Sequence, residues 1–121
     1  MRVLFIGGTG IISSACARRC IELGHEMHLL NRGKSIRSVP TQANVLIADY
    51  RDTAQVQNVL SGSTFDVVVD FICFKEKQAI RDVELFQDKT GQFIFISSAS
   101  AYQTPPASLP VTEETPLENP F

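Results

Sequence analysis

The sequence is poor in cysteine. Cys16, Cys20 and Cys73 form an odd, sparse set with the spacing neither of a disulfide framework nor of a zinc site. Cys16 and Cys20 lie four residues apart on an expected helix, but two ligands are too few for a structural zinc ion. We therefore predict no metal site and expect these cysteines to be buried as small apolar side chains.

The sequence also lacks a strong charge of one sign and any long apolar run. Its net charge of −2 gives no general reason to expect nucleic acid or an anionic membrane as a partner. No run of about 18 apolar residues is present to span a bilayer, and the first residues lack the features of a signal peptide. These absences predict a cytoplasmic protein with no membrane partner, and they disfavour nucleic acid.

What the chain does have is a regular alternation of short apolar runs and helical patterns. With 121 residues, of which 44% are hydrophobic, it is long enough for one domain with a core. The apolar runs predict strands at residues 2–6, 27–31, 45–48, 66–74 and 92–97. The helical patterns fall at residues 12–23, 52–61 and 76–89, and Asp52 with Gln55 predicts the N-terminal cap of the second helix. The expected buried faces of the three helices are Ile12, Cys16, Cys20 and Leu23; Val56, Val59 and Leu60; and Ile80, Val83 and Phe86.

This alternation predicts an α/β fold. We expect a Rossmann-type, doubly wound parallel sheet of five strands in the order 3-2-1-4-5, with helices on both faces. Residues 1–104 would form this domain. Residues 105–121 hold five of the six prolines and follow no period, so we expect an irregular loop or tail there.

A glycine-rich turn, GGTGIIS, follows the first strand directly and opens the first helix. In that context glycines allow a tight turn and a close approach of the backbone to a pyrophosphate at the helix N-terminus. The turn therefore predicts an NAD(P)-binding site, and the alternative is a turn that only connects a strand to a helix. The candidate cofactor-binding residues here are Gly7, Gly8, Thr9, Gly10, Ile11 and Ile12, and Ser13 takes the place of a third glycine.

The end of the second strand bears on which dinucleotide is bound. A carboxylate usually meets the adenosine ribose at this point, but this chain has Asn31 and Arg32. Without the carboxylate a 2′-phosphate is not repelled, and an arginine can donate charge-assisted hydrogen bonds to it. This favours NADP over NAD, with Lys34 and Arg37 as possible assistants. The alternative is that Arg32 is an ordinary solvated loop residue.

Four segments together resemble a known family. They are GGTGIIS from Gly7, NRG from Asn31, Asp49 with Asp52, and FIFISSASAY from Phe93 to Tyr102. The set is similar to the extended short-chain dehydrogenase/reductases, specifically the NAD(P)-dependent sugar epimerase/dehydratase group, and the likeness runs from Met1 to about Phe121.

The resemblance implies roles for further residues. Asp49 and Tyr50 look like the pair that contacts the adenine ring, and Phe71 and Ile72 look like the backbone beside the cofactor's ribose. Ser98 looks like the catalytic hydroxyl that bonds a substrate oxygen, although a hydroxyl at a strand end can also merely satisfy the backbone. The substrate class implied is a small molecule such as a nucleotide-linked sugar, transformed by an epimerase, dehydratase or reductase through hydride transfer.

The chain also departs from the family pattern. Gln103 stands where the family usually has glycine, and neither Tyr50 nor Tyr102, the two tyrosines, has a lysine four residues later. The family's Tyr-x-x-x-Lys pair is thus absent. Residues 111–120, VTEETPLENP, resemble the loop that leads to the catalytic helix. We expect the N-terminal part of a longer enzyme, inactive by itself and prone to self-association through exposed apolar surface.

Two alternatives remain open on the same fold. The chain could be a complete small protein. It could also be a non-catalytic NADP-binding regulator or an RNA-binding protein, which the acidic balance and the lack of interleaved basic and aromatic residues disfavour.

Overall fold

The computed structural model describes residues 1–34 and 39–120, and it shows a parallel sheet with helices on both faces. The strands are β1 (Arg2–Ile6), β2 (Glu26–Asn31), β3 (Asn44–Ile47), β4 (Phe65–Asp70) and β5 (Thr90–Phe95). The helices are α1 (Ile11–Glu22), α2 (Thr53–Val59) and α3 (Glu76–Phe86), with a 3₁₀ helix η1 (Ala99–Ala101) near the end. The sheet order is β3-β2-β1-β4-β5 with every pair parallel, so the predicted fold class and strand order are confirmed.

The central strand β1 feeds two separate cores. Successive side chains of a strand point to opposite faces of the sheet. Leu4 and Ile6 therefore join the core beneath α2 and α3, whereas Val3 and Phe5 join the core beneath α1. All four are buried. This two-sided burial explains why the strand reads as a continuous apolar run.

Helix α2 begins and packs as the sequence predicts. The Asp52 carboxylate accepts from the Gln55 backbone N–H at 3.1 Å and from the Gln55 side-chain amide at 2.9 Å. Val56 and Leu60 are buried, and Val59 packs against the same core. The predicted cap and inward face are confirmed.

The predicted inward face of α1 is wrong. Ile12 is 67% exposed, Leu23 and Cys16 are also exposed, and only Cys20 of the four packs against the core. The fully buried positions are Ser13 and Ala17. Two small side chains let the helix axis approach the sheet closely, a packing that an apolar count does not detect. Of the cysteines, Cys73 alone is fully buried, so the expectation for Cys16 is also wrong.

The predicted inward face of α3 is wrong at two of its three positions. Ile80 and Val83 are 54% and 63% exposed, whereas Phe86 is buried as expected. The helix instead buries Asp82 with Leu85 and Phe86. Because the acidic residue Asp82 lies on the buried face, the apolar residues of α3 do not mark that face. The partners of Asp82 are described below.

Two strand ends also differ from the prediction. Strand β4 ends at Asp70 rather than near residue 74, because the Asp70 side chain accepts from the Ile72 N–H at 2.6 Å and turns the chain out of the sheet. Strand β5 covers residues 90–95, two residues earlier than expected.

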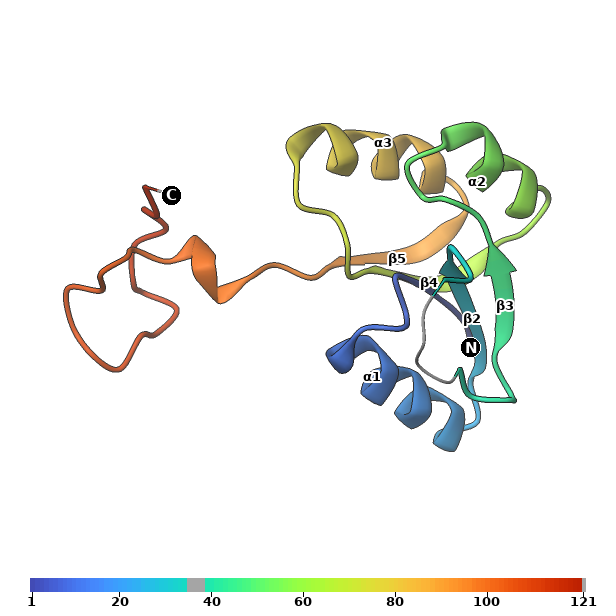
Figure 1. Cartoon of the computed structure of the whole chain (residues 1–121), viewed down its shortest axis with the longest axis horizontal. Helices are drawn as coiled ribbons and strands as arrows, with labels where there is room; N and C mark the ends of the chain where they lie inside the picture. The colour runs from blue at the N-terminus through green and yellow to red at the C-terminus, as the bar shows by residue number, and fades with distance from the viewer. Residues whose placement is uncertain (35–38, 121) are drawn as a thin grey trace.

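The segment after β5 leaves the sheet and closes on itself (Figure 1). The Gln103 N–H donates to the Pro116 carbonyl at 2.7 Å, and the Asn119 side chain bonds the Ser100 carbonyl. Within the described residues, no helix has the length and apolar character needed to cross a membrane.

The close packing of α1 makes a direct prediction. Ala17→Leu inserts three extra heavy atoms into a filled interface and should lower the free energy of unfolding by about 1–3 kcal/mol. Cys16→Leu, one position along the same helix but exposed, should change it by less than about 0.5 kcal/mol. Urea unfolding of both variants tests this, and equal effects would contradict the assigned face.

Candidate functional site

The glycine turn lies at the C-terminal end of β1 and is packed too tightly for side chains. Gly7 has a φ of +79°, and a Cβ built there would stand 2.5 Å from the Ile72 Cγ2 atom. A Cβ on Gly8 would stand 2.5 Å from the Leu29 Cδ2 atom. The Gly7 N–H donates to the Leu30 carbonyl at 3.1 Å, which ties the turn to the end of β2. Two of the glycines are thus required by the packing as well as by any ligand.

The start of α1 has the properties of an anion site. Its N-cap is Gly10, which has no side chain to accept from the first N–H groups of the helix, and its first turn contains no acidic residue. The free N–H groups and the dipole at a helix N-terminus favour an anion such as phosphate. Ile11 and Ile12 are exposed beside it.

Ser13 has a role that the sequence did not reveal. Its hydroxyl accepts from the Gly10 N–H at 2.9 Å and donates to the Gly7 carbonyl at 3.0 Å, and the residue is buried. The Ser13 hydroxyl therefore links the two ends of the turn, whereas a glycine at position 13 would leave the Gly10 N–H without this bond and the Gly7 carbonyl with its bond from the Thr9 N–H at 2.9 Å.

The end of β2 lies next to the turn because β1 and β2 are paired in parallel, with Ile6 opposite Leu30. The Asn31 side-chain oxygen accepts from the Gly33 N–H at 2.7 Å, and its buried Nδ2 has no hydrogen-bond partner among the described residues. Arg32 and Lys34 are exposed. Arg37, also singled out above, lies outside the described residues.

Asp49 and Tyr50 follow β3 but point in different directions. Asp49 is partly exposed, and its side chain accepts from the Arg51 N–H at 3.0 Å. The Tyr50 ring is buried in the core, and its hydroxyl donates to the Asp82 carboxylate at 2.7 Å. Tyr50 can therefore meet a ligand only through its backbone.

Phe71 and Ile72 continue from β4 beside the turn. The Phe71 N–H donates to the Ile6 carbonyl at 3.1 Å, its ring lies 5.0 Å from that of Phe5, and Ile72 is the side chain that closes on Gly7. The structure thus brings together the glycine turn, the end of β2 and residues 71–72 at one edge of the sheet. Such an edge, at the carboxyl ends of parallel strands, is where α/β sheets bind ligands.

Two buried carboxyl groups were not found from the sequence. Asp70 ends β4, Asp82 lies on α3, and both are fully buried. Burial, followed by the neighbouring Asp82, raises the pKa of Asp70 to about 7. Burial also raises the pKa of the Cys73 thiol, whose sulfur lies within 4.8 Å of an oxygen of each carboxyl. The one available signal was an acidic residue ending the very apolar run VVVD.

The Asp82 carboxylate accepts hydrogen bonds from two residues, Tyr50 and Arg81. Its Oδ1 accepts from the Tyr50 hydroxyl and, at 3.1 Å, from the Arg81 guanidinium. Arg81 also donates to the Tyr50 carbonyl at 2.6 Å and lies 4.2 Å from the centre of the Tyr50 ring. Burial, followed by Asp82, raises the pKa of the Tyr50 hydroxyl.

Ser98 is not brought to the glycine turn. It lies on the segment that leaves the sheet after β5 and precedes η1 (Figure 1). Its hydroxyl accepts from the Ser100 N–H and donates to the Ser100 hydroxyl, both at 3.1 Å. In this arrangement the serine caps a 3₁₀ turn.

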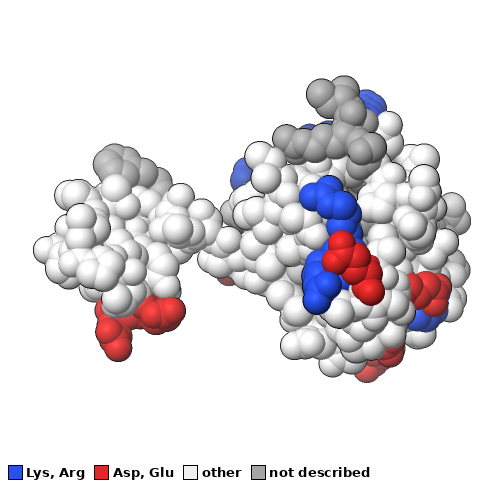
Figure 2. Space-filling model, turned by 90° about the horizontal axis from the view of Figure 1, so that it is seen from below, with Lys and Arg blue, Asp and Glu red and all other residues white. Residues whose placement is uncertain are grey.

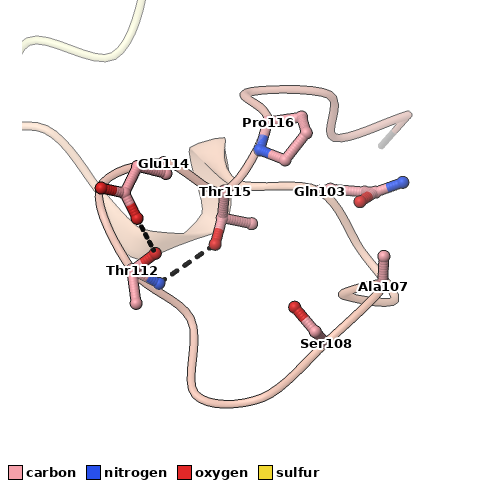
Figure 3. A pocket seen from close by; sticks show the side chains of 7 residues that line it. All are labelled: Gln103, Ala107, Ser108, Thr112, Glu114, Thr115 and Pro116. Carbon is pink, nitrogen blue, oxygen red and sulfur yellow. Dashed lines mark hydrogen bonds between the residues drawn. The ribbon is translucent and has the colours of Figure 1, made fainter.

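A hollow in the C-terminal segment is separate from this edge of the sheet. Figure 3 shows it between the two arms of the closed loop, where Thr112 bonds Thr115 and Glu114. Its lining residues are Gln103, Ala107, Ser108, Thr112, Glu114, Thr115 and Pro116. None of the residues singled out from the sequence as cofactor-binding or catalytic lines it.

Among the residues that the structure describes, charged side chains form no continuous basic surface on the face shown in Figure 2. Seen from the side where α1 lies, acidic and basic groups stand next to each other amid uncharged surface. The described part of that face therefore shows no basic stripe of the kind typical of nucleic-acid binding.

Comparison with known proteins identifies the family. Residues 3–121 match the profile of the NAD dependent epimerase/dehydratase family. The UDP-glucose 4-epimerase of Lactobacillus helveticus is 27% identical over 141 aligned positions, which cover 100% of this chain and 43% of that protein. The chloroplast stem-loop binding protein of 41 kDa b from Arabidopsis thaliana is 30% identical over 114 positions, covering 84% of this chain and 30% of that protein.

Solved structures show the same fold. The UDP-glucose 4-epimerase of Bifidobacterium longum, in complex with NAD⁺ and UDP, superposes with a TM-score of 0.70 at 24% identity. The alignment covers 96% of this chain and 42% of that one. The chain thus spans less than half the length of these relatives. The resemblance drawn from the sequence motifs is confirmed, and the chain belongs to the NAD dependent epimerase/dehydratase family.

Proposed function

We propose that the chain binds a nicotinamide dinucleotide across the ends of β1 and β2, as the cofactor-binding part of an enzyme acting on a nucleotide-sugar-like substrate. The observation that carries this is the glycine turn itself. It is closed to side chains at Gly7 and Gly8, and it leads into a helix whose N-cap glycine offers no capping side chain and whose first turn has no acidic residue. A bound dinucleotide would supply a nicotinamide ring that accepts and returns a hydride.

In this proposal, each segment around the turn contacts a different part of the dinucleotide. Residues 7–12 would hold the pyrophosphate, and the unpartnered Asn31 Nδ2 lies where the adenosine ribose hydroxyls are expected. Asp49 and the backbone of Tyr50 would contact the adenine. Phe71 and Ile72 would flank the second ribose.

Arg32 supports a preference for NADP. It is exposed directly after β2, and in this part of the described structure no carboxylate takes the usual place of the ribose contact. Its guanidinium is free to turn toward a 2′-phosphate, and Lys34 adds a second positive charge nearby.

In this proposal the chain binds the cofactor, and catalysis requires the longer enzyme of which it is a part. Ser98 would bond the reacting oxygen only after giving up its contacts with Ser100. The chain holds no Tyr-x-x-x-Lys pair, so it should bind cofactor without turning over substrate.

A second candidate function rests on the stem-loop binding relative, which is 30% identical over 84% of this chain. In this reading the domain binds a dinucleotide and serves as an RNA-binding or regulatory module. The mixed charges of the face in Figure 2 weigh against an RNA contact there. Retention of a labelled RNA stem-loop at low salt, lost as salt is raised, would favour it.

Gly10→Ala tests the site without breaking the fold. A Cβ at Gly10 meets the Ser13 hydroxyl at 3.1 Å and the φ is ordinary, so the free energy of unfolding should fall by less than about 1 kcal/mol. Dinucleotide affinity by calorimetry should fall about tenfold or more, because the added methyl group lies where the backbone approaches the pyrophosphate. Gly91→Ala is the matched control, since its Cβ also meets its nearest neighbour at 3.1 Å but far from the turn. Unchanged affinity in Gly10→Ala would contradict the proposed site.

Arg32→Ala tests the cofactor preference. Loss of a charge-assisted hydrogen bond, about 1.5–3 kcal/mol, should weaken NADP about tenfold or more and leave NAD within about threefold. Arg18→Ala removes another exposed arginine, on α1, and controls for net charge. Equal losses for the two cofactors would refute the phosphate contact.

Self-association follows from exposed apolar side chains around α3 and β5. Phe74, Ile80, Val83 and Phe95 are all more than half exposed. We expect sedimentation coefficients that rise with protein concentration, and a smaller rise for Val83→Glu. Val45→Glu, at an exposed valine of β3 on the opposite edge of the sheet, should leave the rise intact. A monomer at all concentrations would contradict this expectation.

A further inference from the structure

The two buried carboxyl groups leave a specific gap in their hydrogen bonding. Asp70 uses Oδ1 to accept from the Ile72 N–H, and Asp82 uses Oδ1 to accept from Tyr50 and Arg81. The Oδ2 atoms of both are buried and have no hydrogen-bond partner in the part of the chain that the structure describes. Buried polar atoms are seldom left unsatisfied, because the lost solvation is costly.

A single proton between the two Oδ2 atoms would give both of them a hydrogen-bond partner and would balance the charge of the cluster. Two ionised carboxylates beside one guanidinium would leave a net negative charge on two fully buried side chains. An oxygen atom of Asp70 lies within 4.8 Å of an oxygen atom of Asp82. If one carboxyl is protonated, its O–H can turn toward the other and donate to it, and the cluster with Arg81 becomes neutral. The burial that raises the pKa of Asp70 to about 7 favours holding this proton near neutral pH.

The remaining neighbours do not supply a second charge. On the adjacent strands Asp70 stands opposite Ile6 of β1 and Phe95 of β5, which do not ionise. From the loop and the α2 side the facing groups are the Cys73 thiol and the Tyr50 hydroxyl, and burial raises the pKa of both. From α3 come Asp82 and Arg81.

We propose that Asp70 and Asp82 share one proton, and that this protonated pair positions residues 71–73 against the glycine turn. The connection runs through Ile72: its N–H is held by Asp70, and its side chain closes on Gly7. Without the proton, repulsion between the carboxylates would separate α3 from the end of β4 and loosen this contact. The effect on cofactor binding rests on the proposed function, whereas the shared proton does not.

The sign of the pH dependence follows from the two states. In the unfolded chain an aspartate has its ordinary pKa of about 3.9, and in the folded chain that of Asp70 is raised to about 7. The stabilisation of the folded chain by the proton on this pair is therefore complete below about pH 4 and is lost as the pH rises to about 7. Over that range the unfolding equilibrium constant should rise by up to about tenfold per pH unit, and above pH 7 it should level off.

Asp70→Asn tests the shared proton. The amide keeps an oxygen for the Ile72 N–H and supplies a permanent N–H toward Asp82, so it imitates the protonated state. Urea unfolding between pH 5 and 8 should show wild type losing stability relative to this variant as the pH rises toward 7. Taking the difference between the two proteins removes the contribution of every group that behaves alike in both. Asp88→Asn, at an exposed aspartate whose φ of +61° suits asparagine, should retain the wild-type slope.

A measurement on the wild type guards against a variant that fails to fold. Infrared difference spectra should show the carbonyl stretch of a protonated carboxylic acid at pH 6, fading as the pH passes about 7. Absence of that band, or parallel pH profiles for wild type and Asp70→Asn, overturns the proposal. Stoichiometric binding of Zn²⁺ that is lost in Cys73→Ser also overturns it, because a metal ion would then take the place of the proton.

Cofactor titration separates this inference from the proposed function. With NADP, the wild-type affinity should fall between pH 6 and pH 8, and that of Asp70→Asn should fall less. If stability depends on pH as expected but NADP does not bind at any pH, the proposed function is refuted and the shared proton is not. Equal pH dependence of NADP binding in the two proteins would refute the positioning role.

Discussion

The close approach of β1, β2 and the chain after β4 around the glycine turn is the constraint on which the rest of the structure depends. A Cβ built at Gly7 or at Gly8 would stand 2.5 Å from a side-chain carbon, so a larger residue at either position would have to displace Ile72 or Leu29. This contact fixes where α1 begins and how its small face, Ser13 and Ala17, meets the sheet. It also makes Ile72 part of the wall of the turn.

The polar interactions beneath the turn extend this constraint across the other face of the sheet. Tyr50, which precedes α2, bonds Asp82 of α3, and Asp70 at the end of β4 bonds the Ile72 N–H. Elements far apart in the sequence therefore meet at one buried cluster. A hydrophobic core alone would hold them together, but hydrogen bonds with fixed directions also set the angle at which residues 71–73 approach Gly7.

Some of this organisation could be predicted from the sequence and some could not. Continuous apolar strands such as RVLFI and VVV, the turn between β1 and α1, and the Asp52 cap are local signals, and the structure has a strand, a turn or a helix start at each of these places. The inward faces of α1 and α3 were not, because apolar periodicity counts Ile12 and Ile80 as core and passes over Ser13 and Asp82. The outward position of Ile80 depends on the pairing of Asp82 with Tyr50, 32 residues away in the chain. No local pattern reports such a contact.

The electrostatic balance of the buried cluster matters for the ligand proposed above it. A pyrophosphate carries negative charge, and the same low dielectric that strengthens its contacts with backbone N–H groups would strengthen repulsion from an ionised carboxylate pair. Neutralising one carboxyl with Arg81 and the other with a proton removes that repulsion. A neutral Asp70 still keeps an oxygen for the Ile72 N–H, so residues 71–73 are held without placing an unbalanced charge beneath the proposed phosphate site. A protonated Asp70 thus keeps its hydrogen bond to the Ile72 N–H without carrying a charge, whereas an ionised aspartate at the end of β4 would keep the bond and add a negative charge.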